Sequence, residues 1–165
     1  MRQVVITTIY IIMSKKTSPT DHILKLSSYW PYQITVLADR IARRTTKIVK
    51  EEGLNLSQWR VLAAIADVPG RTSVDVVTIT PMDKGIVSRA TKALLTMGYI
   101  RREASQSDGR ISHLHLTKSG TLLYQTLIPE VEGILQRAVG CLSTQQQQGL
   151  SQKLDALISV IPDLR

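Results

Sequence analysis

The sequence predicts a mainly helical protein that contains one small β-hairpin, and three observations support this fold class. An amphipathic helix with a clear start signal ends near residue 98. Two short strands with a polar turn between them follow it. Long stretches with apolar residues at helical spacing lie on both sides of this segment. A helix followed by a basic hairpin is the outline of a winged helix-turn-helix, and the flanking helices suit dimerisation.

The first long helix is expected from about Ser28 to Glu52, with Gly53 at its end. Mostly apolar residues recur along it at steps of four and three, which predicts a stripe that packs on other helices or on another chain. The stripe consists of Trp30, Ile34, Leu37, Ile41, Thr45 and Ile48.

Two shorter helices are expected before the amphipathic one. Ser57 is placed to cap a helix that runs to about Ala66. Arg71 and Thr72 then form a short strand that pairs with the hairpin, and residues 73–79 form the first helix of the helix-turn-helix. Its predicted buried residues are Val74, Val77 and Ile79.

The amphipathic helix is expected to begin after Thr80, which can cap it, with Pro81 in the first position and Asp83 near the positive end of the helix dipole. Gly98 ends it. One face is apolar and is predicted to be buried, through Val87, Ala90, Leu94 and Met97. The opposite face is short, polar and basic, with Lys84, Ser88, Arg89 and Lys92.

The hairpin is predicted from Tyr99 to Thr117. Its first strand runs to Ala104 and carries Arg101 and Arg102. The turn contains Asp-Gly, a strong hairpin signal, and the second strand starts at Ile111.

Two helices are expected after the hairpin. The first is capped by Thr117, extends to about Gly140 and should be kinked by Pro129. Ser143 and Gln146 have capping-box spacing for the last helix. The predicted inner residues of these helices are Leu123, Leu127, Val131, Ile134 and Ala138, and then Leu150, Leu154, Leu157 and Ile161.

Four sequence runs, in fixed order, together resemble the MarR family of transcriptional regulators. They are DKGIVSRA (83–90), LLTMGYIRR (94–102), SDGR (107–110) and HLTKSG (115–120). The resemblance extends from about Leu26 to the C-terminus and implies a dimeric winged-helix DNA-binding protein. The family often has a second arginine at the wing tip, where this chain has Ile111.

These elements predict four regions. Residues 1–27 form an N-terminal tail, 28–52 a dimerisation helix, 53–117 the winged helix-turn-helix module and 118–165 the C-terminal dimerisation helices. The uncharged run from Val4 to Met13 is too short to span a membrane, and residues 1–12 are interpreted as an upstream mis-start or a vector-derived addition. An extra strand or dimer arm is the alternative.

The net charge and the cysteine content limit the possible classes of function. The net charge is +8, and residues 71–120 contain eight lysines and arginines against four acidic residues, which favours a polyanionic partner. The single Cys141 excludes an intrachain disulfide and suits a reducing cytoplasm. No nucleophile with a base, phosphate loop or zinc motif is visible, so an enzyme is not predicted.

The predicted DNA contacts divide by chemistry. Ser88 and Arg89 are best placed to read base edges, and Lys84 and Lys92 suit phosphates. Arg110 at the wing tip should enter the minor groove, and Asp108 should orient its guanidinium, as in the family's wing. The remaining candidates are Gly85, Arg101 and Arg102.

Two further features are interpreted as structural and not as functional sites. His113 and His115 share a strand face but form an incomplete zinc set, so neither a metal nor a cofactor is expected. Cys141 is interpreted as a packed residue, with a thiol-based redox sensor as the alternative.

A ligand site is predicted from the few aromatic residues. Family members often bind small anionic aromatic compounds between the dimerisation helices and the DNA module. The candidates are Trp30, Tyr32 and Trp59, with Arg43 or Arg60 as carboxylate partners, unless the aromatic residues only anchor the dimer core. The predicted function is a homodimeric repressor that a small aromatic acid releases from an inverted-repeat operator. A constitutive or architectural DNA-binding protein is the alternative.

Overall fold

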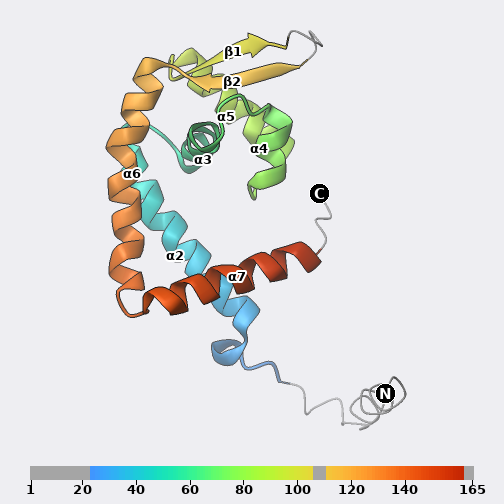
Figure 1. Ribbon diagram of the computed structural model, residues 1–165, viewed down its shortest axis with the longest axis vertical. Helices are drawn as coiled ribbons and strands as arrows, with labels where there is room; N and C mark the ends of the chain where they lie inside the picture. Colours follow the sequence, from blue (N-terminus) through green and yellow to red (C-terminus); the bar gives the residue numbers. More distant parts are fainter. Residues whose placement is uncertain (1–22, 106–110, 162–165) are drawn as a thin grey trace, which may run out of the picture. The chain divides into compact units, whose positions relative to one another are not determined.

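The computed structural model describes residues 23–105 and 111–161 (Figure 1). The interpretation of residues 1–12 lies outside this part of the chain. The elements in order are η1 (Leu26–Ser28), α2 (Trp30–Glu51), α3 (Leu56–Asp67), α4 (Ser73–Ile79), α5 (Lys84–Thr96), β1 (Ile100–Ala104), β2 (Ser112–Leu116), α6 (Lys118–Val139) and α7 (Thr144–Val160). This is the predicted mainly helical fold with a two-stranded hairpin.

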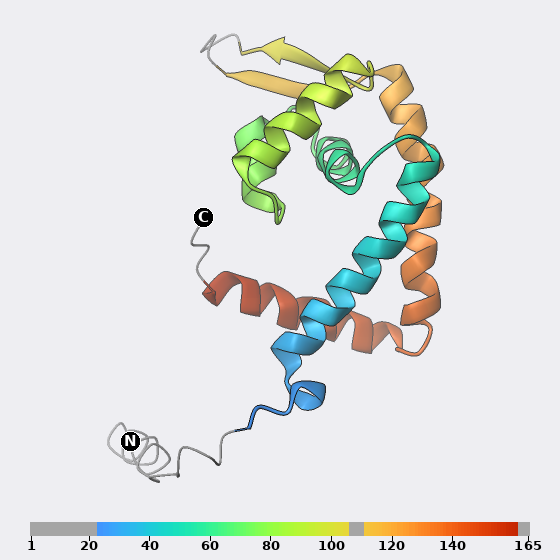
Figure 2. The same ribbon diagram turned by 180° about the vertical axis from the view of Figure 1, so that it is seen from behind.

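The chain divides into two compact units at Asp39 and Arg40, so α2 begins in the smaller unit and ends in the larger one. The core of the larger unit is built around α3, which contacts α4, α5, α6 and β2. Figures 1 and 2 show α3 nearly end-on amid these elements. Leu62 and Ile65 of α3, Val87 and Leu94 of α5 and Leu114 of β2 are all at most 1% exposed. Their burial holds the helix-turn-helix and the hairpin in one core.

The hairpin is antiparallel and pairs Ile100 with Leu116 at its base. The segment before α4 extends it, because the Gly70 N–H donates to the Leu114 carbonyl at 2.9 Å and the Leu114 N–H donates to the Arg71 carbonyl at 3.0 Å. The predicted pairing of Arg71 with the wing is thus confirmed. It attaches the base of the wing to the start of α4.

Two predicted helix starts were wrong. Asp83, not Thr80, caps α5, and its carboxylate accepts a hydrogen bond from the Ile86 N–H at 2.7 Å. Thr80 instead ends α4, where its hydroxyl donates to the Val76 carbonyl at 2.6 Å. Asn55, not Ser57, caps α3 through a capping box with Gln58. In both cases the residue with extended backbone just before the first helical turn is the cap.

Other local predictions are confirmed. Thr117 caps α6, and Ser143 forms a capping box with Gln146 at the start of α7. Gly98 has φ of 73°, and the adjacent N–H groups of Gly98 and Tyr99 donate to the carbonyls of Leu95 and Leu94. This is a Schellman ending, which favours glycine at the left-handed position.

Burial on the two helices of the helix-turn-helix differs from the prediction at three positions. Met97 is 46% exposed because α5 ends one residue before it. Val74 and Ile79 are 71% and 50% exposed, whereas Val76 is the buried residue of α4. The helix is only two turns long, so one residue of register decides which side chain faces the core.

Apolar side chains remain uncovered at both flanks. In the smaller unit, the start of α2 exposes Trp30, Ile34 and Leu37. In the larger unit, α7 buries none of its residues and exposes Leu150, Ile158 and Val160. Within the described ranges, no helix combines the length and apolar character needed to cross a membrane.

Candidate nucleic-acid interface

The outer face of α5 is the central feature of the site. Lys84, Gly85, Ser88, Arg89 and Lys92 are all exposed on it. The opposite side of the same helix is fixed in the core through buried residues (Val87, Ala90, Thr91 and Leu94). The predicted polar and basic face therefore points away from the core, on a helix held rigidly by its other face.

At the N-terminal end of α5, Gly85 lies close to the side chains of Asp83 and Arg89. A Cβ built on Gly85 lies 3.2 Å from the Asp83 carboxylate and 3.4 Å from a guanidinium nitrogen of Arg89. The head of Arg89 therefore lies over Gly85, beside the capping carboxylate. Because Gly85 has no side chain, another molecule's backbone can approach the helix closely here. Lys84 occupies the first helical position, where the helix dipole disfavours a cation. Its charge is therefore better explained by an anionic partner than by helix stability.

The two arginines of β1 have different surroundings. Arg101 donates to the Glu103 carboxylate at 2.7 Å, and His115 lies 3.7 Å from the same carboxylate. The hydrogen bond and charge of Arg101 lower the pKa of Glu103, with a smaller contribution from His115. Arg102 lies on the other face of the hairpin, opposite the buried Leu114. Arg101 is thus partly neutralised, whereas Arg102 is directed toward α4 and α5.

A groove of about 390 Å³ lies where α4, α5 and β1 meet. Lys84 and Arg102 place two cations in its lining, and Ser88 adds a hydroxyl. Thr91 also lines it, and the buried hydroxyl of this residue has no hydrogen-bond partner in the described part of the chain. The other lining residues are Ser73, Val74, Val77 and Val87. No pattern in the sequence predicts this groove, because it forms only where three separate elements meet.

Two of the predicted DNA contacts belong to the tip of the wing. Asp108 and Arg110 fall within residues 106–110, outside the described residues. At the base of the wing, the Nδ1 atom of His113 lies 2.7 Å from the Gly70 carbonyl oxygen. This contact adds a third link between β2 and the segment before α4. No group of three metal-ligating side chains occurs in the residues that the structure covers.

The predicted ligand residues belong to both compact units. Trp59 is 6% exposed and stacks on Tyr124, with ring centroids 5.7 Å apart. Arg60 is half-buried and Arg43 is exposed in the larger unit, whereas Trp30 and Tyr32 are exposed in the smaller unit.

Cys141 lies between α6 and α7 and is exposed, so the prediction of a packed cysteine was wrong. The short connection between these two helices leaves it at the surface.

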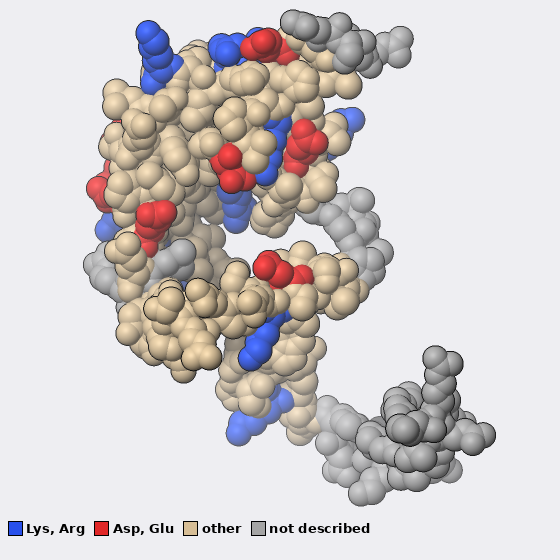
Figure 3. Space-filling view, in the orientation of Figure 1, with Lys and Arg blue, Asp and Glu red and all other residues tan. Residues whose placement is uncertain are grey.

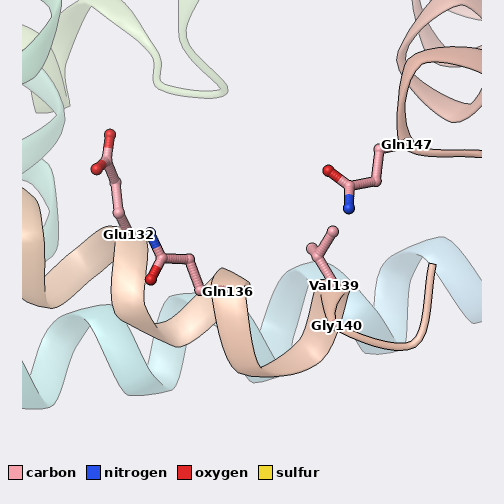
Figure 4. A pocket seen from close by; sticks show the side chains of 5 residues that line it. All are labelled: Glu132, Gln136, Val139, Gly140 and Gln147. Carbon is pink, nitrogen blue, oxygen red and sulfur yellow. The ribbon is translucent and has the colours of Figure 1, made fainter. Parts of the chain in front are cut away.

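A second cavity, of about 380 Å³, lies at the junction of α6 and α7. It is lined by Glu132, Gln136, Val139, Gly140 and Gln147. In Figure 4 the side chains of Glu132 and Gln136 extend from the same side of α6, and Gln147 faces Val139 from α7. Among the described residues that line it, the only charged one is the acidic Glu132, so this lining does not favour an anion.

Comparison with known proteins gives consistent results. A sequence model of the MarR family matches residues 52–111. The chain is 27% identical over 95 residues to the transcriptional regulator HosA of Escherichia coli O157:H7, covering 58% of this chain and 70% of that protein. It is 23% identical over 112 residues to the HTH-type transcriptional regulator PetP of Rhodobacter capsulatus, covering 68% of each.

Solved structures show the same fold. A MarR-family transcriptional regulator from Silicibacter pomeroyi superposes with a TM-score of 0.78 at 24% identity, covering 86% of this chain and 97% of that one. The transcriptional regulator SlyA superposes with a TM-score of 0.73 at 22% identity, covering 80% of this chain and 93% of the other. The fold shared with these structures extends beyond residues 52–111.

Proposed function

Since this chain is a MarR-family transcriptional regulator, we propose that it acts as a homodimeric repressor and leaves an inverted-repeat operator when a small aromatic or anionic compound binds. The observation that carries the proposal is the outer face of α5, which is exposed, short and basic on a helix whose other face is buried. Such a helix can enter the major groove without any change in the core.

The side chains divide into reading and positioning roles. Arg89 and Ser88 contact base edges, because a guanidinium can pair bidentately with guanine and a hydroxyl can donate or accept. Lys84, Lys92 and Arg102 contact phosphates. Gly85 permits close approach of the DNA backbone. Asp108 and Arg110 complete the interface at the wing tip.

The second copy of the chain covers the exposed apolar residues at the flanks. Ile158 and Val160 of α7 are each 73% exposed, and Leu37 of α2 is 53% exposed. Large apolar side chains exposed in this way on α7 and on α2 favour an interaction site on each helix. Residues 28–52 and 118–165 are therefore the dimerisation elements, and residues 53–117 are the DNA-binding module.

The effector has two candidate positions. The first is beside Trp30 and Tyr32, with Arg43 or Arg60 as the carboxylate partner; there an effector acts by favouring a dimer geometry that no longer fits the DNA. The second is the groove between α4, α5 and β1. A small anion there pairs with Lys84 and Arg102 and competes directly with DNA phosphates.

The test begins with selection of binding sites from random duplex DNA. Two-fold related α5 helices should select an inverted repeat with half-sites about 10 bp apart. The selected duplex is then titrated with and without hydroxybenzoates and other aromatic acids to test release. A coupling free energy of about 1 to 3 kcal/mol corresponds to a roughly 5- to 150-fold loss of DNA affinity. A protein that binds the selected site but responds to no compound is a constitutive DNA-binding protein. Release only after oxidation of Cys141 identifies a thiol sensor.

A further inference from the structure

A second basic surface lies on α2, on a different helix from the proposed DNA-reading face. The part of α2 in the larger unit carries Arg40, Arg43, Arg44, Lys47 and Lys50, and all five are exposed. Four of them recur at steps of three, four and three residues, which places them along one side of the helix. We call these four, Arg40, Arg43, Lys47 and Lys50, the basic stripe.

The stripe lies opposite the buried side of the same helix. Thr45 and Val49 are 5% and 0% exposed, and Ile48 packs partly buried against the core. At 100° per residue, the stripe residues lie roughly opposite Thr45 and Val49. They therefore point outward from the larger unit.

Helix stability does not explain the stripe. Cations three or four residues apart repel each other and destabilise a helix, as in Arg43 with Lys47 and Lys47 with Lys50. Within the described residues, no ion pair is made by Arg40, Lys47 or Lys50. Only Lys50, in the last turn, is favoured by the helix dipole. The concentration of positive charge therefore points to a polyanionic partner.

The spacing of the stripe differs from the distribution of charge on the face shown in Figure 3. On the face shown in Figure 3, lysine and arginine side chains are scattered, and several lie next to acidic ones. In Figure 2 the C-terminal part of α2 and α5 both lie on the near side of the larger unit, whereas in Figure 1 both lie behind other helices. The two helices that carry the basic surfaces thus lie on the same side of this unit.

We propose that the basic stripe is a second, sequence-independent contact for the phosphate backbone of double-stranded DNA. The proposal rests on the proposed function only in taking DNA as the ligand. From Arg40 to Lys50 the stripe covers ten residue steps, or about 15 Å of helix. Over that length the duplex carries about nine phosphate charges. Contacts of this kind release counterions and strengthen binding to any sequence.

The apolar side of α2 argues against a lipid surface as the partner. A helix that lies on a membrane needs an accessible apolar face beside its cations. Here the face opposite the stripe is committed to the core through Val49, with Ile41 and Ile48 half-buried. The exposed cations of the stripe instead suit phosphates held outside the protein.

A matched pair of double variants tests the proposal. Lys47→Gln with Lys50→Gln removes two charges from the stripe, and Lys25→Gln with Lys153→Gln removes two exposed lysines elsewhere. Binding to a mixed-sequence duplex of about 40 bp is measured by fluorescence anisotropy between about 50 and 200 mM salt. We expect the stripe variant to bind about tenfold more weakly at the lowest salt, with a log–log salt slope reduced by about 1.8 per protomer. The control variant should remain close to the unmodified chain.

Two further arms separate the possible failures. Lys84→Gln with Lys92→Gln tests the proposed function itself, and an unchanged affinity for that variant would count against α5 and not against the stripe. Equal DNA binding by the stripe variant and its control overturns the stripe proposal. The proposal also fails if the stripe variant binds DNA as well as the unmodified chain but, unlike the control variant, no longer binds phosphatidylserine vesicles or an acidic peptide. Circular dichroism of each variant confirms that α2 remains helical.

Discussion

The winged-helix module and the C-terminal helix α7 belong to the same compact unit, yet they satisfy their apolar residues in opposite ways. In the module, Leu62, Ile65, Leu94 and Leu114 are all fully buried within one chain. In α7, Leu150 is 47% exposed and Ile158 is 73% exposed. The core of the module is complete in a single chain, whereas the apolar residues of α7 are left exposed. In the proposed function, the module reads DNA as a rigid body and α7 assembles the dimer.

The local signals of the two regions are equally good, so capping does not explain the contrast. Helix α7 starts with a complete capping box, as do α3 and α4. A cap contributes about 1 kcal/mol, whereas burying one large aliphatic side chain contributes about 1.5 to 3 kcal/mol. Packing against other elements, and not capping, therefore decides which helices are stabilised within a single chain.

The largest effect is expected from truncating the module core. Ile65→Ala removes a fully buried side chain from the central helix α3 and should cost about 2 to 5 kcal/mol of folding free energy. Chemical denaturation followed by circular dichroism measures the loss. A cost below about 0.5 kcal/mol would mean that α3 is not the centre of the core.

The same substitution in α7 sharpens the contrast. Ile158→Ala should leave the folding of the module nearly unchanged, because the side chain is 73% exposed in the single chain. It should weaken the proposed dimer about tenfold or more, because the second copy would cover this side chain. Sedimentation at several concentrations measures the dimer constant. An unchanged constant would place the dimer interface elsewhere.

The next effect concerns DNA and not stability. Arg89→Ala should cost about 1 to 3 kcal/mol on the operator and relax base preference at one position per half-site. Lys84→Ala should weaken binding to all sequences alike and reduce the salt dependence. Anisotropy titrations on operator and random duplexes compare them. Equal losses on both duplexes for Arg89→Ala would reassign it to phosphate contact.

The smallest effect is the pH dependence of the cap of α4. The Asp75 carboxylate accepts hydrogen bonds from the Thr72 N–H at 2.7 Å and the Thr72 hydroxyl at 2.9 Å, and these bonds lower the pKa of Asp75 below its ordinary value of 3.8. The stabilisation is therefore present above about pH 4 and is lost as the pH falls through the lowered pKa. Asp75→Ala should cost about 0.5 to 1 kcal/mol at neutral pH and less near pH 3. A cost that does not change over this range would exclude the carboxylate as its source.

Much of the helical architecture, unlike this contrast in burial, could be predicted from the sequence, because the signals for helix starts and ends are local. The bounds of α4, the Gly98 ending of α5 and the cap of α7 depend on a few neighbouring residues. The caps of α3 and α5 were missed because two capping residues lie near each start and the core selects between them.

The site was only partly predictable, because some of its features depend on packing between elements that are far apart in the sequence. The polar face of α5 follows from helical periodicity. The groove that joins Lys84 to Arg102 does not, because it needs α4, α5 and β1 in their folded positions. Likewise, the exposure of Val74 follows from packing between elements and not from its own helix.

The most direct test of the account compares two duplexes, the selected inverted repeat and the same duplex with one half-site scrambled. Stoichiometric titration followed by sedimentation gives the number of chains bound to each. A dimer that presents two α5 helices predicts two chains on the intact repeat and a loss of most of the specific affinity on the scrambled one. A single chain that binds the remaining half-site with undiminished affinity would contradict the account.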